Sequence, residues 1–267
     1  MSSKKQVDEL FARTVEDWDR CYTDSRPKTL SAQNLVSRRR FALEMLEARI
    51  PRGSKILDVG CGTGHLTREL IQRGYEAWGV DFSEAMVHYA HEHYDSDRFQ
   101  AGDIERIPFP DNTFDAVVCL GVMEYLEKDD TALREMWRVL KPGGRAVITT
   151  PSITCPFFHV DVVLQKVRVL ARPLVRLLRY RLSGRPVPSR NEVPPVIHRR
   201  YYRRGWLKLM RSMQLEVEDW ACHCWGCYSL EPFFDQGALC RASDRFARNP
   251  LLSWLASNQL ACVRAIK

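Results

Sequence analysis

The stretch Lys55-Ile-Leu-Asp-Val-Gly-Cys-Gly-Thr-Gly-His-Leu-Thr67 decides the fold of this chain. It opens with an apolar run of the kind found in buried strands, at Ile56, Leu57 and Val59. Glycines follow at every second position, Gly60, Gly62 and Gly64, and a helical pattern then begins, with apolar residues at Leu66, Leu70 and Ile71. A strand, a glycine turn and a helix open many α/β nucleotide-binding units, because glycine lets the backbone turn tightly and approach a ligand.

The glycine spacing and one carboxylate indicate which ligand this turn holds. Dinucleotide-binding turns read Gly-x-Gly-x-x-Gly and place a pyrophosphate at the helix N-terminus. Here the spacing is Gly-x-Gly-x-Gly, and His65 stands where the dinucleotide motif has its third glycine. Asp58 would repel a pyrophosphate, whereas it suits a ligand with an ammonium group, such as S-adenosylmethionine. A glycine turn that binds no ligand is the alternative.

Residues 57–64 resemble the first motif of the class I S-adenosylmethionine-dependent methyltransferases, and the likeness is strong over residues 40–151. The resemblance implies an α/β fold: a seven-stranded, mostly parallel, doubly wound (Rossmann-like) sheet whose last strand is antiparallel. It also implies S-adenosylmethionine as the cofactor. The residues it assigns to the cofactor in this motif are Asp58, Gly60, Cys61, Gly62, Thr63 and Gly64.

A second carboxylate, Asp81, ends the next expected strand, 75–81, 21 residues beyond Gly60. At this distance an acidic residue accepts hydrogen bonds from both ribose hydroxyls in dinucleotide folds. Ser83 is expected to cap the helix that follows. The resemblance adds Phe82 and Met86 to the ribose and adenine contacts. It also places Asp103 near the adenine amino group, with Ile104 packing on the ring.

An apolar run at 116–120 is the next expected strand, and it ends at Leu120. Ligands of such folds bind at the carboxyl ends of parallel strands, so we expect Leu120 to contact the cofactor and the methyl acceptor to bind beside it. A helix at 129–140, a strand at 145–150 and later strands at 215–220 and 260–266 continue the alternation. This order predicts a parallel sheet with helices on both faces.

The first 50 residues are expected to form helices that cover the cofactor, as they do in similar methyltransferases. One apolar stripe comprises Val7, Leu10, Phe11 and Val15. An arginine in this region contacts the cofactor carboxylate in the family, which assigns Arg38, with Arg39 as the alternative. A purely solvated arginine face at 38–40 is the other interpretation.

Residues 152–200 form a basic insertion in which only Asp161 and Glu192 are acidic. On a helical wheel of 162–182, one side carries Arg168, Arg172, Arg176 and Arg179. The opposite side carries Val163, Val167, Leu170, Leu174, Leu177 and Leu178. This pattern fits a helix lying on an anionic membrane surface, or a lid that packs on the sheet domain or on a dimer partner. Pro173 is expected to kink the helix or to begin a second one.

Four side chains are candidates for acid–base catalysis: Glu124 and Tyr125 after the fourth strand, and His159 and His198 at the insertion. In overall pattern the chain is nearest to the ubiquinone-biosynthesis O-methyltransferases. These carry Glu-x-x-Glu-His after the fourth strand, which can hold a divalent metal. Gly121, Glu124 and Tyr125 stand there, so only one carboxylate remains and we expect no metal.

Nine cysteines and no export signal predict reduced thiols in a cytoplasmic protein. Cys222-His-Cys-Trp-Gly-Cys227 contains one Cys-x-x-Cys pair, Cys224 and Cys227, without the second pair that structural zinc sites use. Buried thiols near the substrate pocket are therefore expected, and a zinc site is the alternative. No apolar run is long enough to span a membrane.

We expect a single methyltransferase domain over 1–267, made of cap helices (1–50), a cofactor-binding core (51–151), the insertion (152–200) and the remaining sheet (201–267). The expected function is methyl transfer to a small hydrophobic or lipid-linked acceptor, at a phenol- or quinol-like oxygen, in the cytoplasm at a membrane surface. A polar natural product or a glycolipid precursor, methylated at nitrogen or oxygen, is the alternative. The sequence leaves the oligomeric state open.

The net charge of +7 also raises two other classes of function. A nucleic-acid methyltransferase of this fold would carry an Asp/Asn-Pro-Pro-aromatic motif, whereas residues 119–122 read Cys-Leu-Gly-Val, so nucleic acid is not an expected partner. A membrane-binding module without enzymatic activity is the second. The intact glycine motif with both carboxylates argues against it.

Overall fold

The structure is a computed structural model of the chain, and it describes residues 4–23, 27, 29–94, 97–183, 199–226, 230 and 235–266. The side chains of 172, 174–183 and 236 are outside this description. Two residues that the sequence singles out, His198 and Cys227, therefore lie outside the described residues.

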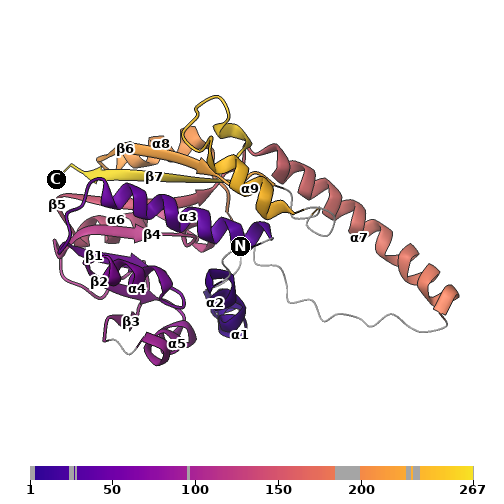
Figure 1. The fold of residues 1–267 in the computed structure, drawn as a ribbon, viewed down its shortest axis with the longest axis horizontal. Helices are drawn as coiled ribbons and strands as arrows, with labels where there is room; N and C mark the ends of the chain where they lie inside the picture. The colour runs from indigo at the N-terminus through magenta and orange to yellow at the C-terminus, as the bar shows by residue number, and fades with distance from the viewer. Residues whose placement is uncertain are drawn as a thin grey trace.

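The described residues form one seven-stranded sheet with the order β3-β2-β1-β4-β5-β7-β6 (Figure 1). The strands are Lys55–Val59 (β1), Glu76–Asp81 (β2), Phe99–Ala101 (β3), Phe114–Cys119 (β4), Leu140–Pro151 (β5), Leu215–His223 (β6) and Asn258–Ala265 (β7). The first five pair in parallel, and β7 lies antiparallel between β5 and β6. The expected sheet, including its antiparallel last strand, is confirmed.

Helices cover both faces of the sheet and bury its apolar side chains. On one face, α6 (Asp129–Val139) packs on β5 and α8 (Arg203–Ser212) on β6, and Met136 and Trp206 are buried in one apolar cluster. On the other, α3 (Leu30–Glu47) and α4 (His65–Gln72) bury Phe41 and Leu70. The remaining helices are α1 (Lys4–Arg13), α2 (Val15–Thr23), α5 (Glu84–Tyr94), α7 (Pro156–Ser183), α9 (Gln236–Asp244) and the short η1 (Met123–Tyr125) and η3 (Ser253–Leu255).

The basic insertion contains one long helix, α7, which projects from the body of the molecule (Figure 1). Pro173 lies inside this helix, so the interpretation that a second helix begins there is wrong. A proline inside a helix removes one backbone hydrogen bond, because its nitrogen has no hydrogen to donate. Arg172, Leu174, Arg176, Leu177, Leu178 and Arg179 have side chains outside the description. Among the described residues no helix is both long and apolar enough to cross a membrane.

Cys224 and Cys240 form a disulfide that joins the end of β6 to α9. The expectation that all cysteines are free thiols is therefore wrong for this pair. The packing of α9 beside β6 brings the two Cα atoms to 4.4 Å, within the range that a disulfide requires. Because Cys224 is bonded to Cys240, its sulfur is not available to a zinc ion.

Candidate active site

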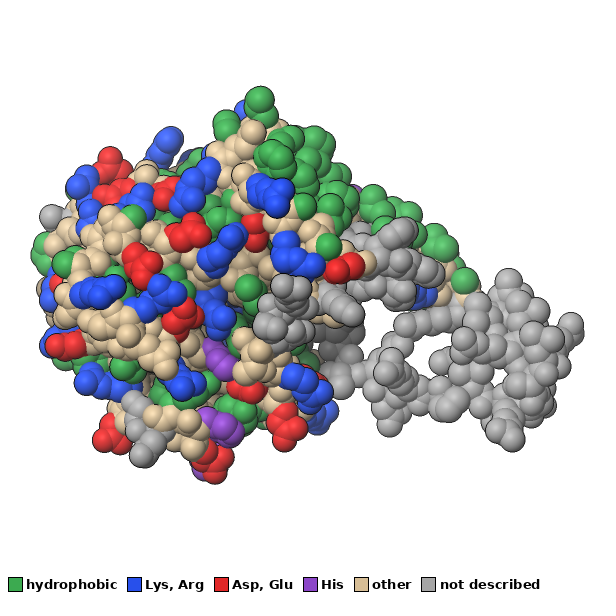
Figure 2. Space-filling view, in the orientation of Figure 1, with side chains coloured by type: hydrophobic (Ala, Val, Ile, Leu, Met, Phe, Trp, Pro, Cys, Tyr) green, Lys and Arg blue, Asp and Glu red, His purple; other side chains and the backbone are tan. Residues whose placement is uncertain are grey.

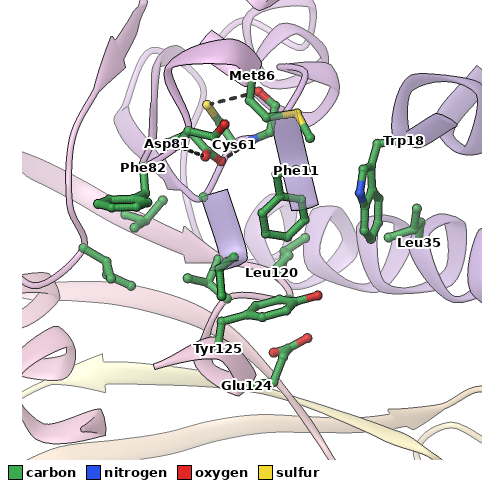
Figure 3. A pocket seen from close by; sticks show the side chains of 18 of the residues that line it. Phe11, Trp18, Leu35, Cys61, Asp81, Phe82, Met86, Leu120, Glu124 and Tyr125 are labelled. Atoms are coloured by element: carbon green, nitrogen blue, oxygen red, sulfur yellow. Dashed lines mark hydrogen bonds between the residues drawn. The ribbon is translucent and has the colours of Figure 1, made fainter. Parts of the chain in front are cut away.

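A cavity of about 690 Å³ opens at the carboxyl ends of β1, β2 and β4. One end, which we call the glycine-loop end, is lined by residues 60–63, Asp81 and Met86. The other, the η1 end, is lined by Glu124 and Tyr125. Figure 3 shows these ends facing one another, with Phe11 of α1 between them. One continuous space therefore joins the residues expected for the cofactor to those expected for the acceptor.

The glycine loop is held in shape by backbone hydrogen bonds and by a close contact. The amides of Gly60 and Cys61 donate to the Val80 carbonyl at 2.7 and 3.1 Å. Gly60 has φ +74°, and a Cβ there would overlap Cγ2 of Val122. Gly64, with φ +85°, begins α4 and is not among the cavity-lining residues; a Cβ would lie 2.7 Å from Phe99. Glycine is required at both positions, for different reasons.

Asp81 is the carboxylate at the centre of the glycine-loop end. Its two oxygens accept hydrogen bonds from the amides of Gly62 (2.8 Å) and Ser83 (2.9 Å). A carboxylate has about four acceptor sites, so this arrangement leaves capacity for hydroxyl donors. Burial raises the pKa of Asp81, and the two amides oppose the rise. Ser83 does not cap α5 with its side chain, since its Oγ lacks a hydrogen-bond partner among the described residues and lines the cavity.

Asp58 lies behind the glycine loop and is not among the residues that line the cavity. Its carboxylate is buried and accepts a hydrogen bond from Thr67 Oγ1 at 2.8 Å. Burial raises the pKa of Asp58 to about 7, and the nearby Asp81 adds to the rise. Any effect of Asp58 on a ligand in the cavity must therefore be indirect, through its charge or through the shape of the glycine loop.

An apolar slot lies beside Asp81. Met86 and Ile104 are buried there, and Phe82 is 44% exposed. All three line the cavity, together with Cys61, Thr63 and Leu120. Asp103 also lines it, where its carboxylate pairs with Lys4 of α1 and accepts a hydrogen bond from the Glu105 amide. The side chains of this slot are mostly apolar, which suits the flat faces of a planar aromatic base.

Arg38 lines the cavity, whereas Arg39 points elsewhere. The guanidinium of Arg38 donates from Nη2 to the Tyr22 hydroxyl at 3.1 Å, and its buried Nε has no partner among the described residues. Gly121 has φ +75°, and a Cβ there would lie 2.8 Å from Cζ of Arg38. Arg39 forms an ion pair with Glu69 at 3.4 Å. Of the two alternatives in the sequence, the geometry favours Arg38 as the carboxylate contact.

Glu124 and Tyr125 occupy the η1 end. Glu124 is buried, and its Oε2 lacks a hydrogen-bond partner among the described residues. Burial raises the pKa of Glu124, with Arg38 opposing the rise. The Tyr125 ring packs edge-on against Phe11, with the centroids 5.4 Å apart. A buried carboxylate with an unused oxygen facing a cavity is suited to accept a proton.

The structure does not bring His159 to the cavity. Its ring is exposed, and Nε2 lies 2.9 Å from the carbonyl oxygen of Ile153. The other candidate, His198, lies outside the described residues. No group of three or more metal-ligating side chains occurs in the part of the chain that the structure describes.

Several cavity residues were not assigned from the sequence. Phe11 and Trp18 belong to α1 and α2, in which no residue is buried, and both line the cavity. The apolar stripe of α1 was visible in the sequence, but its partner was not. Other unassigned residues form what we call the rim, the solvent-facing edge of the cavity: Phe158, Gln165, Arg200 and Asn258. Arg200 stacks on Phe158, with Cζ 3.8 Å from the ring centroid.

The residues present fit S-adenosylmethionine. Asp81 suits a ribose diol, the slot of Met86 and Ile104 suits adenine, and the half-buried Arg38 suits a carboxylate. Thr63 Oγ1 and Ser83 Oγ are buried without hydrogen-bond partners in the described part of the chain, as expected where a polar ligand supplies them. Asp58 lies behind the turn where a dinucleotide would place its pyrophosphate, and its carboxylate would repel that group.

Residues 57–148 match the protein family described as "Methyltransferase domain". The chain therefore carries a class I methyltransferase domain. The resemblance found in the sequence is confirmed, and the family match supports S-adenosylmethionine as the cofactor. The matched segment runs from β1 through most of β5, so this methyltransferase domain includes the glycine loop, Asp81 and the η1 end.

The names of similar proteins refer to different methyl acceptors. The chain is 35% identical over 150 residues to the malonyl-[acyl-carrier protein] O-methyltransferase of Pectobacterium atrosepticum, covering 55% of this chain and 54% of that protein. It is 42% identical over 117 residues to the demethylmenaquinone methyltransferase of Deinococcus radiodurans, covering 42% and 47%. The chain thus spans about half the length of these curated relatives.

A solved structure extends the likeness in fold. The magnesium protoporphyrin IX methyltransferase of Synechocystis PCC 6803, solved with bound S-adenosylhomocysteine (SAH), superposes with a TM-score of 0.61. The match covers 98% of this chain and all of that chain, at 16% sequence identity. At this identity the superposition shows the shared fold. The shared fold includes β6 and β7, which lie outside the matched family segment.

Proposed function

We propose that the protein transfers a methyl group from S-adenosylmethionine to a small hydrophobic or lipid-linked acceptor, at an oxygen. The observation that carries this proposal is the single cavity that joins Asp81 at one end to Glu124 at the other. A cofactor bound along the glycine loop would direct its methionine part toward Arg38 and the η1 end.

Residues at and around the glycine-loop end have distinct roles in binding the cofactor. Asp81 accepts the ribose hydroxyls, while Gly60 and Gly62 let the backbone approach the ligand. Met86 and Ile104 enclose the adenine. Asp58 favours the positively charged end of the cofactor through its negative field, and Arg38 pairs with the cofactor carboxylate.

S-adenosylmethionine supplies a methyl group on a positively charged sulfur. The protein's main task is to hold the acceptor oxygen in line with that methyl group and to exclude water. Glu124 Oε2 accepts the proton that a hydroxyl acceptor loses as its bond to the methyl group forms. Phe11 and Tyr125 enclose the space between cofactor and acceptor and limit the access of water.

The acceptor class rests on the lining of the cavity and on the relatives. Phe11, Trp18 and Leu126 are apolar cavity residues that suit a hydrophobic ring or chain. Two relatives are named for malonyl-acyl carrier protein and demethylmenaquinone. The rim, by contrast, is polar at Gln165 and Arg200, which favours the second candidate, a polar natural product or a glycolipid precursor.

We also propose that the chain works at an anionic membrane surface, which it meets with α7. On this helix Val163, Val167 and Leu170 are exposed, by 59%, 56% and 79%. A lid whose apolar face packs on the sheet domain would bury these side chains. The exposed face therefore favours a membrane, or a second copy of the chain, over a lid.

A label-partition assay tests the proposal. Purified protein is incubated with methyl-labelled S-adenosylmethionine and a crude cell extract, and the organic, aqueous and acid-precipitable fractions are counted. We expect label in the organic fraction, and its loss with Glu124→Gln. Label confined to the aqueous fraction would favour the polar acceptor. Label in none of the fractions, at full cofactor binding, would contradict methyl transfer.

A further inference from the structure

A second exposed apolar element lies 67 residues beyond the end of α7 in the sequence, at 250–255. Leu251 is 79% exposed and Trp254 is 52% exposed. Side chains of this size are costly to leave in water, and neither is needed to close the core of the domain. Their exposure calls for a partner.

This element adjoins the first turns of α7. The thiol of Cys155 donates to the Leu255 carbonyl at 3.1 Å, and the amide of Ser152 donates to the Ser257 carbonyl at 2.8 Å. Residues of η3 also contact α7 directly. Figure 2 shows apolar side chains gathered at the base of α7 and continuing along it. The two elements thus present neighbouring apolar surfaces.

The apolar face of α7 points away from the domain. Val160, Val163, Val167 and Leu170 recur at intervals of three and four residues and share one face of the helix. Phe158 and Gln165, which line the cavity, and the buried Asp161 lie on the other side. An outward apolar face beside Leu251 and Trp254 can be covered only by another body.

The charge around these elements is positive. Between 162 and 171, and again between 245 and 258, the sequence contains no aspartate or glutamate. Lys166 and Arg168 are exposed on α7, and Arg203 donates to the Ser253 hydroxyl at 3.2 Å, beside Trp254. Exposed leucine and tryptophan with flanking cations fit the interface of an anionic lipid bilayer.

We infer that Leu251 and Trp254 form, with α7, a two-element docking surface for an anionic membrane. The inference rests on the proposed function, because α7 alone was assigned to the membrane there. Two separated contacts fix the orientation of the protein on the bilayer, which one helix cannot do. Phe158 and Gln165 of α7 and Asn258 just after η3 line the cavity, so docking places the rim at the lipid surface. A lipid-dissolved acceptor then enters without crossing bulk water.

Co-sedimentation with vesicles tests the surface. Full-length protein is mixed with vesicles of three parts phosphatidylcholine to one part phosphatidylglycerol. The double variant Leu251→Ser/Trp254→Ser is compared with Ile266→Ser, a matched control whose side chain is 55% exposed elsewhere. We expect the double variant to lose at least about tenfold in vesicle affinity, because two large apolar side chains leave the bilayer. The control should bind as the wild type does.

SAH binding, measured on the same samples, separates this inference from the proposed function. Wild-type vesicle affinity in the double variant would overturn the inference. So would wild-type protein that binds SAH but no vesicles. Vesicle binding that depends on Leu251 and Trp254, in a protein that does not bind SAH, would support the docking surface and contradict the methyltransferase.

A fluorescence measurement gives a second readout. Vesicles containing brominated lipid quench tryptophans that insert into the bilayer. We expect quenching in the wild type and its loss in Trp254→Phe, which keeps an apolar ring and binds vesicles within about threefold of the wild type. Equal quenching in both proteins would contradict insertion of Trp254. The inference is overturned if the wild type is a dimer that does not bind vesicles and the double variant is a monomer. The surface would then be an interface with a second copy of the chain.

Discussion

The two ends of the cavity differ in how the chain builds them. The glycine-loop end comes from one short piece of chain, residues 59–104, in which each ligand-facing residue lies at a strand end, in the turn after it or in the first turn of a helix. The η1 end and the rim combine residues of α1, η1, α7 and β7, which are far apart in sequence. Local rules thus determine the first end, whereas the second depends on how distant segments pack.

The ends also differ in charge. At the glycine-loop end, Asp58 and Asp81 are held by a hydroxyl and by backbone amides. At the η1 end, Glu124 Oε2 and Arg38 Nε are buried atoms that lack hydrogen-bond partners in the described part of the chain. We expect changes at the first end to alter cofactor binding and changes at the second to alter turnover.

Of the predicted changes, Glu124→Gln should have the largest effect, and it should lower the rate of turnover. Removal of a general base lowers the rate by about 100-fold or more, while the shape of the η1 end is kept. SAH affinity, measured by calorimetry, should change by less than about threefold. Because burial raises the pKa of Glu124, the wild-type rate should still climb with pH above the usual carboxyl range. A variant that turns over at the wild-type rate would refute the role of Glu124.

Asp81→Asn should have the second-largest effect, and it should weaken cofactor binding. Loss of two charge-assisted hydrogen bonds to ribose is expected to weaken SAH by about 30- to 100-fold. The exposed carboxylate Asp97 offers a control, since Asp97→Asn should leave the affinity unchanged. If Asp81→Asn binds SAH as tightly as the wild type, the ribose lies elsewhere. Cofactor binding would then not depend on this carboxylate of the glycine-loop end.

Gly60→Ala and Gly53→Ala form a matched pair. Both glycines have positive φ, +74° and +82°, but only at Gly60 does a Cβ meet another atom within 4 Å. We expect Gly53→Ala to lower the free energy of unfolding by about 1 kcal/mol. Gly60→Ala should cost about 1–3 kcal/mol more, from the overlap with Val122, and should weaken SAH. Equal costs in chemical denaturation would show that the loop accommodates the methyl group.

The last prediction, Asp58→Asn, concerns the pH dependence of stability. Burial raises the folded-state pKa of Asp58 to about 7, so the folded protein retains a proton that the unfolded chain has lost. The free energy of unfolding should therefore fall as pH rises from about 4 to 7, by at most about 1.4 kcal/mol per pH unit. The variant should flatten this slope in urea titrations. An unchanged slope would show that Asp58 is ionised throughout.

The sequence predicted the sheet and the glycine-loop end because these depend on local patterns. The glycine spacing, the apolar run before it and Asp81 at the next strand end all carry their information within a few residues. The same reasoning could not reach Phe158 or Asn258 at the cavity, since only the tertiary arrangement brings them together. Nor could it see that the apolar face of α7 points outward, because an amphipathic pattern does not state which side meets the domain.

The disulfide, like the η1 end, depends on tertiary packing and not on a local sequence pattern. Cys224 and Cys240 are 16 residues apart, and the sequence offered six other cysteines outside the Cys-x-x-Cys pair. The pairing follows from the packing of α9 beside β6, which no spacing rule specifies. Residues whose role depends on such packing are the ones that a sequence leaves unassigned.

Calorimetric titration of the purified protein with SAH, and separately with NAD, tests the central claim most directly. Both ligands contain adenine and ribose, but only NAD carries a pyrophosphate. The Gly-x-Gly-x-Gly loop with Asp58 behind it predicts one site for SAH per chain and no binding of NAD. Binding of NAD in preference to SAH, or no binding of SAH to folded protein, would contradict the assignment of this cavity to S-adenosylmethionine.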